Sequence, residues 1–211
     1  MKNKKILLSG FGSISAFILW TALVKNIGIG YIGPKGSSVG FSSINGFFHK
    51  LTGVNFNIYT LTDWLGLVPV CFMSGFAILG FIQLIKRKNI SKVDTDILIL
   101  GGFYIIMAAA YLFFEIFVIN YRPVLIEGIL EASYPSSTTL LAMCVMPTAA
   151  IQLNRRIKSI KFRKAAVCSI NIFTVFMVLA RLISGVHWLT DIIGGIFLSM
   201  GLVLIYYAVT E

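Results

Sequence analysis

The stretch ARLISGVHWLTD, residues 180–191, places an arginine, a histidine and an aspartate between two long apolar segments. Ionisable side chains are costly near a membrane core and commonly have a functional reason to be there. His187 and Asp191 are four residues apart, so on a helix they would share a face and touch. A carboxylate on one ring nitrogen would fix the imidazole tautomer and leave the other nitrogen free as a nucleophile.

The same residues also allow a purely structural interpretation. Asp191 would cap a helix that begins near Ile192, and His187 would lie at the membrane interface without a chemical role. The rest of the sequence is needed to choose between the chemical and the structural interpretation.

The whole chain is too apolar for a soluble domain of its size: of its 211 residues, 57% are hydrophobic and only 12% are charged. Six apolar stretches are long enough, or nearly so, to cross a bilayer as helices. They cover residues 6–24, 64–85, 97–119, 137–153, 165–183 and 192–209, of which the fourth is short and contains Pro147. We therefore expect an all-α, polytopic membrane protein, a six-transmembrane-helix bundle that forms a single membrane-embedded domain over residues 1–211.

Basic residues carry the net charge of +10 and gather at alternate ends of these stretches. They cluster before the first stretch, after the second and after the fourth, within residues 2–5, 86–92 and 155–164. This positive-inside pattern predicts a multi-pass protein of the cell (plasma) membrane with both termini in the cytoplasm. The basic loops hold almost no aromatic or base-reading residues, so we expect no nucleic-acid partner. The first apolar stretch is longer than a signal-peptide core of about 7–15 residues, which favours a retained helix.

This topology leaves three outward-facing loops, at about residues 26–63, 120–136 and 184–190. The first contains a segment, residues 44–52, that could lie flat on the membrane as a short interfacial helix. The second begins with Arg122-Pro123 and ends in a run of serine and threonine after Pro135, and the third holds His187. The candidate residues of the second and third loops and of the 180–191 stretch are therefore expected at the same membrane face.

Two arginines beside a hydroxyl-rich helix start suit an oxyanion such as phosphate. Guanidinium groups match phosphate oxygens in bidentate geometry. The run after Pro135 opens the fourth helix, where free backbone N–H groups and the positive dipole end favour an anion. Each residue also has an ordinary explanation, Ser136 as a helix N-cap and Arg122 as an interfacial side chain. A shared phosphate site explains all of them together.

The same residues resemble the three signature blocks of the type 2 phosphatidic acid phosphatase superfamily. This family includes bacterial lipid-phosphate phosphatases and is related to vanadium haloperoxidases. Its pattern is K-x6-R-P, then P-S-G-H, then S-R-x5-H-x3-D, of which the third block is the most specific. The matching residues here are Arg122-Pro123, Pro135-Ser136 and Arg181-x5-His187-x3-Asp191.

The resemblance implies a phosphatase with a metal-free mechanism and no cofactor. His187 would attack phosphorus and form a phosphohistidine, and Asp191 would orient and stabilise its ring. The phosphate would be bound by both guanidinium groups and by the start of the fourth helix, at Arg122, Arg181, Ser136, Ser137 and Thr138.

The chain departs from the family pattern at four positions. Glu115 stands in place of the lysine, Ser137 of the glycine, Thr138 of the second-block histidine and Ala180 of the serine. Thr138 cannot serve as the general acid near neutral pH, because a hydroxyl is a far weaker acid than an imidazolium. Glu115 lies seven residues before Arg122, nearly two helical turns, so it could pair with that arginine or act as the acid.

Loss of the acid should hurt monoester cleavage more than pyrophosphate cleavage. Phosphate, with a second pKa of about 6, is a better leaving group than an alkoxide. We therefore expect a phosphatase that acts on lipid phosphates or pyrophosphates at the extracytoplasmic face, and the resemblance supplies undecaprenyl pyrophosphate as the leading candidate. Its partners would be the lipid phosphate substrate and the membrane lipids, and its oligomeric state stays open.

Two other functions compete with this one. Glu115 and Thr138 favour a catalytically weakened or inactive member of the family that binds or transports lipid phosphates. A small channel would need polar residues along several spans, whereas here they cluster at one end.

Overall fold

The protein is built almost entirely from helices, and the computed structural model describes residues 2–211. Its elements are α1 (Lys2–Asn26), the 3-10 turn η1 (Pro34–Gly36), α2 (Ser42–Thr52), α3 (Phe56–Leu65), α4 (Leu67–Arg87), the 3-10 turn η2 (Ile90–Lys92), α5 (Thr95–Ile116), α6 (Ser137–Arg156), α7 (Ile160–Ile183) and α8 (Leu189–Thr210). The expected all-α fold is confirmed. The six apolar stretches correspond to α1, α4, α5, α6, α7 and α8.

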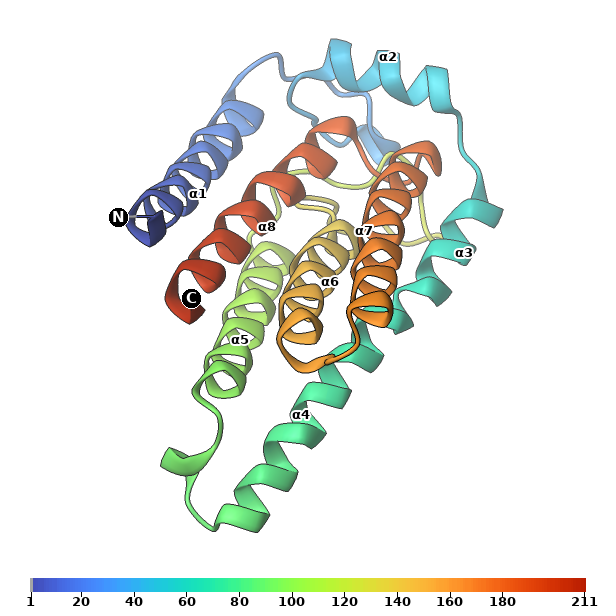
Figure 1. Cartoon of the computed structure of the whole chain (residues 1–211). Coiled ribbons are helices and arrows are strands. Elements are labelled where there is room, and N and C mark those ends of the chain that lie inside the picture. Colours follow the sequence, from blue (N-terminus) through green and yellow to red (C-terminus); the bar gives the residue numbers. More distant parts are fainter. Residues whose placement is uncertain (1) are drawn as a thin grey trace.

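The helix α6 lies at the centre of the bundle, with α7 on one side of it and α8 on the other (Figure 1). The helices α4 and α5 also contact α6, and α1 packs along the outer side of α8. The contact between α1 and α8 is close because glycines lie in it. A Cβ added to Gly201 would lie 2.5 Å from the side chain of Ile14 and 3.1 Å from the carbonyl of Gly10, so a larger residue there would require Ile14 to move and would tighten the contact with the α1 backbone.

Within residues 2–211, five helical segments are long and apolar enough to cross a membrane by themselves: α1, the α3–α4 pair, α5, α7 and α8. This confirms a polytopic membrane protein. The helix α6 is not among them, although its sequence stretch was expected to be a span like the others. It carries the buried polar residues Thr139, Thr148 and Gln152, which lower its hydropathy. A helix surrounded by protein need not be apolar all round, so α6 serves as the inner member of the bundle.

The helices α3 and α4 are nearly continuous and are separated at Gly66. Pro69 has no N–H to donate to the carbonyl of Leu65, which interrupts regular helical bonding at this point. The Gly66 N–H is instead shared between the carbonyls of Thr62 and Asp63, at 3.0 and 3.1 Å. The sequence interpretation placed α3 within an outer loop, and the structure corrects this to a helix.

The helix α2 lies across one end of the bundle (Figure 1) and confirms the short helix expected at residues 44–52. Phe47 and Leu51 are exposed on it, whereas Asn45 is completely buried. The Asn45 amide donates to the Thr190 hydroxyl at 3.0 Å and accepts from the Thr190 N–H at 3.2 Å. These bonds fix α2 to the first turn of α8.

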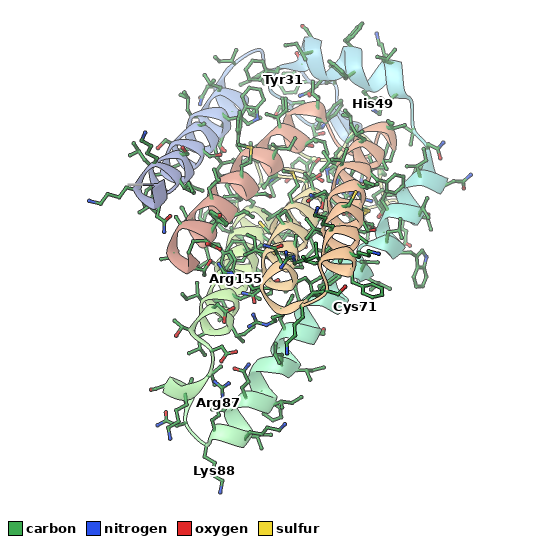
Figure 2. All side chains as sticks on the ribbon, in the orientation of Figure 1. Tyr31, His49, Cys71, Arg87, Lys88 and Arg155 are labelled. Atoms are coloured by element: carbon green, nitrogen blue, oxygen red, sulfur yellow. The ribbon has the colours of Figure 1, made fainter. Side chains whose placement is uncertain are left out.

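Both termini lie at the end of the bundle opposite α2 (Figure 1). Arg87 and Lys88 belong to that end, and Tyr31 and His49 to the other (Figure 2). The alternation of charge along the sequence thus becomes a separation of charge in space, with the basic loops at one end.

Candidate functional site

Four residues singled out in the sequence lie together at the α2 end of the bundle. Arg122 comes from the α5–α6 loop, Arg181 from the last turn of α7, His187 from the α7–α8 turn and Asp191 from the first turn of α8. Their exposed fractions are only 8%, 1%, 3% and 0%, respectively. Both guanidinium groups lie over the ring of Tyr59, with Cζ of Arg122 at 6.0 Å and Cζ of Arg181 at 4.7 Å from its centroid. Charged side chains are rarely buried this deeply without partners, so the contacts of each one matter.

The ring of His187 is held in one tautomer. Its Nδ1 lies 3.1 Å from the carbonyl oxygen of Ser133 and 3.2 Å from the hydroxyl of the same residue. Because a carbonyl oxygen can only accept, Nδ1 carries the proton and Nε2 keeps its lone pair, 3.4 Å from Nη1 of Arg122. Burial, together with the positive charges of Arg122 and Arg181, lowers the pKa of His187 well below its usual value. The ring is therefore neutral.

Asp191 takes part in capping α8, the structural role that its sequence position allowed. As the third residue of α8 it accepts the Trp188 N–H at 2.9 Å, which caps the helix. The same carboxylate accepts from the Asn120 amide at 3.1 Å and from the hydroxyl of Ser133.

The direct hydrogen bond between Asp191 and His187 that the spacing predicted is not made. Oδ2 of Asp191 and Nδ1 of His187 are 3.8 Å apart, which is beyond hydrogen-bonding distance. His187 precedes α8, so the two residues do not lie on one helix face, and the hydroxyl of Ser133 lies between them.

Arg122 pairs with Glu131, and the expected pairing with Glu115 is not formed. Nε of Arg122 lies 2.9 Å from Oε2 of Glu131, and the backbone N–H of Arg122 donates to the backbone carbonyl of Glu131 at 3.0 Å. The α5–α6 loop folds back on itself between Tyr121 and Ala132, which places the two residues opposite each other. The helix α5 ends at Ile116, so the helical spacing between Glu115 and Arg122 does not apply.

The surroundings of Arg181 come from α3. Its Nη1 donates to the Thr62 hydroxyl at 2.9 Å and to the Tyr59 carbonyl at 3.4 Å, and it lies 3.3 Å from Oδ1 of Asp63. A buried guanidinium without such partners would carry a large desolvation cost. The α3 segment therefore determines where Arg181 sits.

The start of α6 offers hydrogen-bond donors that the protein does not use. Ser136 is the N-cap residue, and its own N–H donates to the Asp191 carbonyl at 3.1 Å, but its hydroxyl caps nothing. The next N–H groups, from Ser137 and Thr138, have no acceptor within the helix because they belong to its first turn.

Buried side-chain atoms in this region that find no hydrogen-bond partner among residues 2–211 include Oγ of Ser136, Nε of Arg122 and Nε of Arg181. The Arg122–Glu131 contact is an ion pair that is not aligned as a hydrogen bond. Orphaned buried donors are rare in proteins, and a group of them beside two guanidinium ions suits an oxyanion.

Two cavities meet at the start of α6. A polar cavity of about 430 Å³ is lined by residues that include Glu115, Tyr121, Arg122 and Glu131. A mainly apolar cavity of about 420 Å³ lies between α4, α5 and α6, and its lining includes Asp63, Leu67, Met107, Thr138 and Leu141. Tyr111 and Ser137 line both cavities. Thr138 is thus turned towards the apolar compartment and Glu115 towards the polar one.

Several residues that hold this site together were not predicted. Glu131 and Ser133 lie in the loop between the first two signature blocks, and Asn120 lies within the first block just before Arg122, positions that could have marked them as site residues. Tyr59 and Thr62 gave no comparable signal, because α3 was not expected to be a helix.

Comparisons with known proteins involve the same part of the chain. The model of the PAP2 superfamily matches residues 106–211, about half of the chain. A crystal structure of a transmembrane PAP2-type phosphatidylglycerolphosphate phosphatase from Bacillus subtilis is similar in fold, with a TM-score of 0.59 and 19% sequence identity over 95% of this chain and 94% of that chain. No curated protein matches the sequence.

Proposed function

Because this chain belongs to the PAP2 superfamily, we propose that it is a membrane hydrolase that removes phosphate from a lipid phosphate or pyrophosphate. The family and the fold support a lipid phosphatase. We further propose that the reaction passes through a phosphohistidine intermediate, that the substrate is a pyrophosphate and that the site faces away from the cytoplasm.

The observation that carries the proposal is the buried, neutral ring of His187, whose Nε2 lone pair lies 3.4 Å from Nη1 of Arg122. A neutral imidazole is a nucleophile, whereas an imidazolium is not. The guanidinium beside it is where an anion would be held, so the electrophilic phosphorus and the attacking nitrogen would meet at this point.

In the first step, the Nε2 lone pair forms a bond to phosphorus, and the bond from phosphorus to the leaving oxygen breaks with its electron pair on that oxygen. In the second step, water attacks phosphorus and passes a proton to the phosphate group released in the first step, and the N–P bond breaks with its electron pair returning to Nε2 of His187. The Asp191 carboxylate offsets the positive charge of the phosphorylated ring.

The phosphate oxygens would be bound by the two guanidinium groups and by the start of α6. Arg122 and Arg181 approach from separate elements, and Nε of Arg181 and the hydroxyl of Ser136 have no hydrogen-bond partner among residues 2–211. The N–H groups of Ser137 and Thr138 add the positive end of the α6 dipole.

Thr138 cannot protonate the leaving group, which favours a substrate whose leaving group needs no proton. A pyrophosphate releases phosphate, with a second pKa of about 6, whereas a monoester releases an alkoxide. Undecaprenyl pyrophosphate is the leading candidate. Glu115, which lines the polar cavity with Arg122, is the remaining acid candidate.

The two cavities suit an amphiphilic substrate. The phosphate and its leaving group would occupy the polar cavity beside Arg122, and the first part of the lipid chain would occupy the apolar cavity between α4, α5 and α6. The positive-inside pattern supports an orientation in which this end of the bundle lies outside the cytoplasm of a plasma-membrane protein, with both termini inside and residues 1–211 acting as one domain.

A family member that binds lipid phosphate without turning it over is the second candidate. Glu115 and Thr138 favour it, because they stand where the family pattern has a lysine and the histidine that would protonate the leaving group. Such a protein would hold phosphate and release none.

Phosphate release from a panel of prenyl and glycerol lipid phosphates and pyrophosphates, with and without a chelator, tests the proposal. We expect release by the purified protein, faster from pyrophosphates than from monoesters, and unaffected by the chelator. His187→Asn should lower the rate by more than about 1000-fold, because it removes the nucleophile. Glu115→Gln should slow turnover if that residue is the acid, and an unchanged rate would leave it a structural residue.

The matched control is His49→Asn, since His49 is the only other histidine of the chain and lies at the same end of the bundle. We expect this variant to retain the wild-type rate. Binding without release would favour the second candidate, faster release from monoesters would reject the pyrophosphate preference, and dependence on added divalent metal would contradict the mechanism.

A further inference from the structure

We propose that Ser133 is a positioning residue whose hydroxyl bridges the ring of His187 and the carboxylate of Asp191, in place of a direct bond between them. This inference rests on the proposed function, because it assigns Ser133 a part in the same reaction. Ser133 is 3% exposed and lies just before the start of α6, outside the residues that match the family pattern.

The distances allow a bridge and do not allow a direct bond. Nδ1 of His187 and Oδ2 of Asp191 are 3.8 Å apart, whereas Oγ of Ser133 lies 3.2 Å from Nδ1 and hydrogen-bonds to Oδ2. A hydroxyl has one proton to donate and two lone pairs to accept with. A carboxylate can only accept, so the Ser133 proton goes to Asp191 and a lone pair faces the Nδ1–H of His187.

Ser133 therefore contacts the ring twice, through its hydroxyl and through its carbonyl oxygen at 3.1 Å. Both oxygens accept from Nδ1–H, which leaves Nε2 as the nucleophile towards Arg122. When Nε2 bonds to phosphorus the ring becomes positive, and the hydroxyl transmits the stabilising effect of the Asp191 carboxylate to it. No proton has to change place, because Nδ1 keeps its proton through both steps.

The loop and its neighbours hold Ser133 in this position. Its N–H donates to the Asn120 carbonyl at 2.9 Å, and the Asn120 amide donates in turn to Oδ1 of Asp191 at 3.1 Å. The next residue, Tyr134, is 2% exposed, and its hydroxyl lies 2.7 Å from that of Thr21 on α1. Both oxygens of Asp191 are thus bound by the segment that carries Ser133, so the same loop holds the serine and the carboxylate in place.

The test compares Ser133→Ala with Ser133→Thr and with Ser199→Ala. Ser199 is a completely buried serine of α8 that is outside the site, so its substitution removes a buried hydroxyl without touching the bridge. We expect Ser133→Ala to lower kcat by roughly 10- to 100-fold, the effect of a hydrogen bond to a charged group, with KM changed less than about twofold. Ser133→Thr, which keeps the hydroxyl, should restore most of kcat, and Ser199→Ala should resemble the wild type.

A double-mutant cycle shows whether Ser133 acts through Asp191. In an Asp191→Asn background, Ser133→Ala should cost less than about threefold, because the bridge has already lost its carboxylate. Equal losses in the two backgrounds would overturn the proposal.

A measurement that needs no turnover separates this proposal from the proposed function. In a His49→Asn background, His187 is the only ring labelled by ¹⁵N-histidine. Ser133→Ala and Asp191→Asn should each move the Nδ1 resonance of His187, and Ser199→Ala should not. An Nδ1 resonance unaffected by Ser133→Ala would refute the bridge even in an active phosphatase. A displaced resonance in a protein that releases no phosphate would uphold the bridge and reject the phosphatase.

Discussion

At the scale of single residues, the state of His187 follows from what surrounds each of its nitrogens. Acceptors from Ser133 surround Nδ1, and a guanidinium group lies beside Nε2. If the imidazole were protonated, its positive charge would be repelled by Arg122 and Arg181 and would also lack hydration because the ring is buried. The surroundings of both nitrogens therefore keep the ring neutral. The hydroxyl of Ser133 lies between the ring and the carboxylate of Asp191.

The protonation of His187 gives a pH dependence of known sign. Its lowered pKa means that the neutral, nucleophilic ring persists below the usual histidine value of about 6.5, so activity should fall only at a more acidic pH. Arg122→Gln removes one of the charges that lower this pKa, so the pKa should rise. We expect the ¹⁵N titration of His187, in a His49→Asn background, to move to higher pH in this variant.

Arg155→Gln is the control for this titration, because Arg155 lies at the opposite end of the bundle. Its substitution should leave the His187 titration where it is. A titration that moves to lower pH in Arg122→Gln would contradict the arrangement of charges around the ring.

The residues with the strongest chemical character could be predicted from the sequence, and their partners could not. Placing Arg122, Arg181 and His187 at one membrane face needs only the order of the spans. Which carboxylate pairs with Arg122 depends on how the α5–α6 loop folds back, and loop conformation leaves no periodic signal. Glu131 instead of Glu115, and Ser133 between His187 and Asp191, are consequences of that fold.

At the scale of elements, α3 is the part of the scaffold that the site depends on most visibly. Thr62 faces the bundle and binds Arg181 at 2.9 Å, while Thr60 on the same helix is exposed. Because the contact determines where the guanidinium lies, the loss of the Thr62 hydroxyl should displace the proposed phosphate-binding arginine and leave the proposed nucleophile in place.

We therefore expect Thr62→Val to raise KM about five- to tenfold, the effect of one lost hydrogen bond of about 1 kcal/mol, with kcat nearly unchanged. Thr60→Val, the same substitution on the exposed side of α3, should change neither constant. Steady-state kinetics on both variants check this. If the two variants behave alike, α3 has no specific part in holding Arg181.

The elements themselves were largely predictable because apolar length is a strong signal for helices that face lipid. The helix α6 gave a weaker signal for a physical reason, since its neighbours cover it and it can carry Thr148 and Gln152 in its buried faces. The helix α3 is not predicted because Asn57, Thr60, Thr62 and Asp63 break the apolar pattern before Trp64, so the apolar stretch begins only where α3 is about to end.

At the scale of the whole molecule, ion pairs join the helix ends opposite the site. Arg87 lies 2.8 Å from Asp94, and Arg156 lies 2.9 Å from Asp96, which connects α4, α5 and α6. Arg155 reaches Glu211 at 2.7 Å and so adds the end of α8. Exposed pairs contribute little individually, typically below about 1 kcal/mol, but a network of them holds the ends of the bundle in register.

The separation of charge between the two ends predicts the orientation in the membrane. In a background in which Cys71, Cys144 and Cys168 are replaced by alanine, Tyr31→Cys and Lys88→Cys each provide one exposed thiol, at opposite ends of the bundle. A membrane-impermeant maleimide added to intact cells should label Tyr31→Cys, and should label Lys88→Cys only after the membrane is opened. The reverse pattern would place the site on the cytoplasmic side and leave its chemistry unchanged.

Tyr111 and Ser137 line both the polar and the apolar cavity, so the two compartments share a wall at the start of α6. Under the proposed function, a lipid whose phosphate is bound beside Arg122 can keep its chain among the helices, so neither substrate nor product has to leave the membrane for water. Enzyme and substrate then find each other by diffusion in two dimensions. Turnover should follow the mole fraction of the lipid in its leaflet, so inert lipid slows the reaction whereas extra buffer does not.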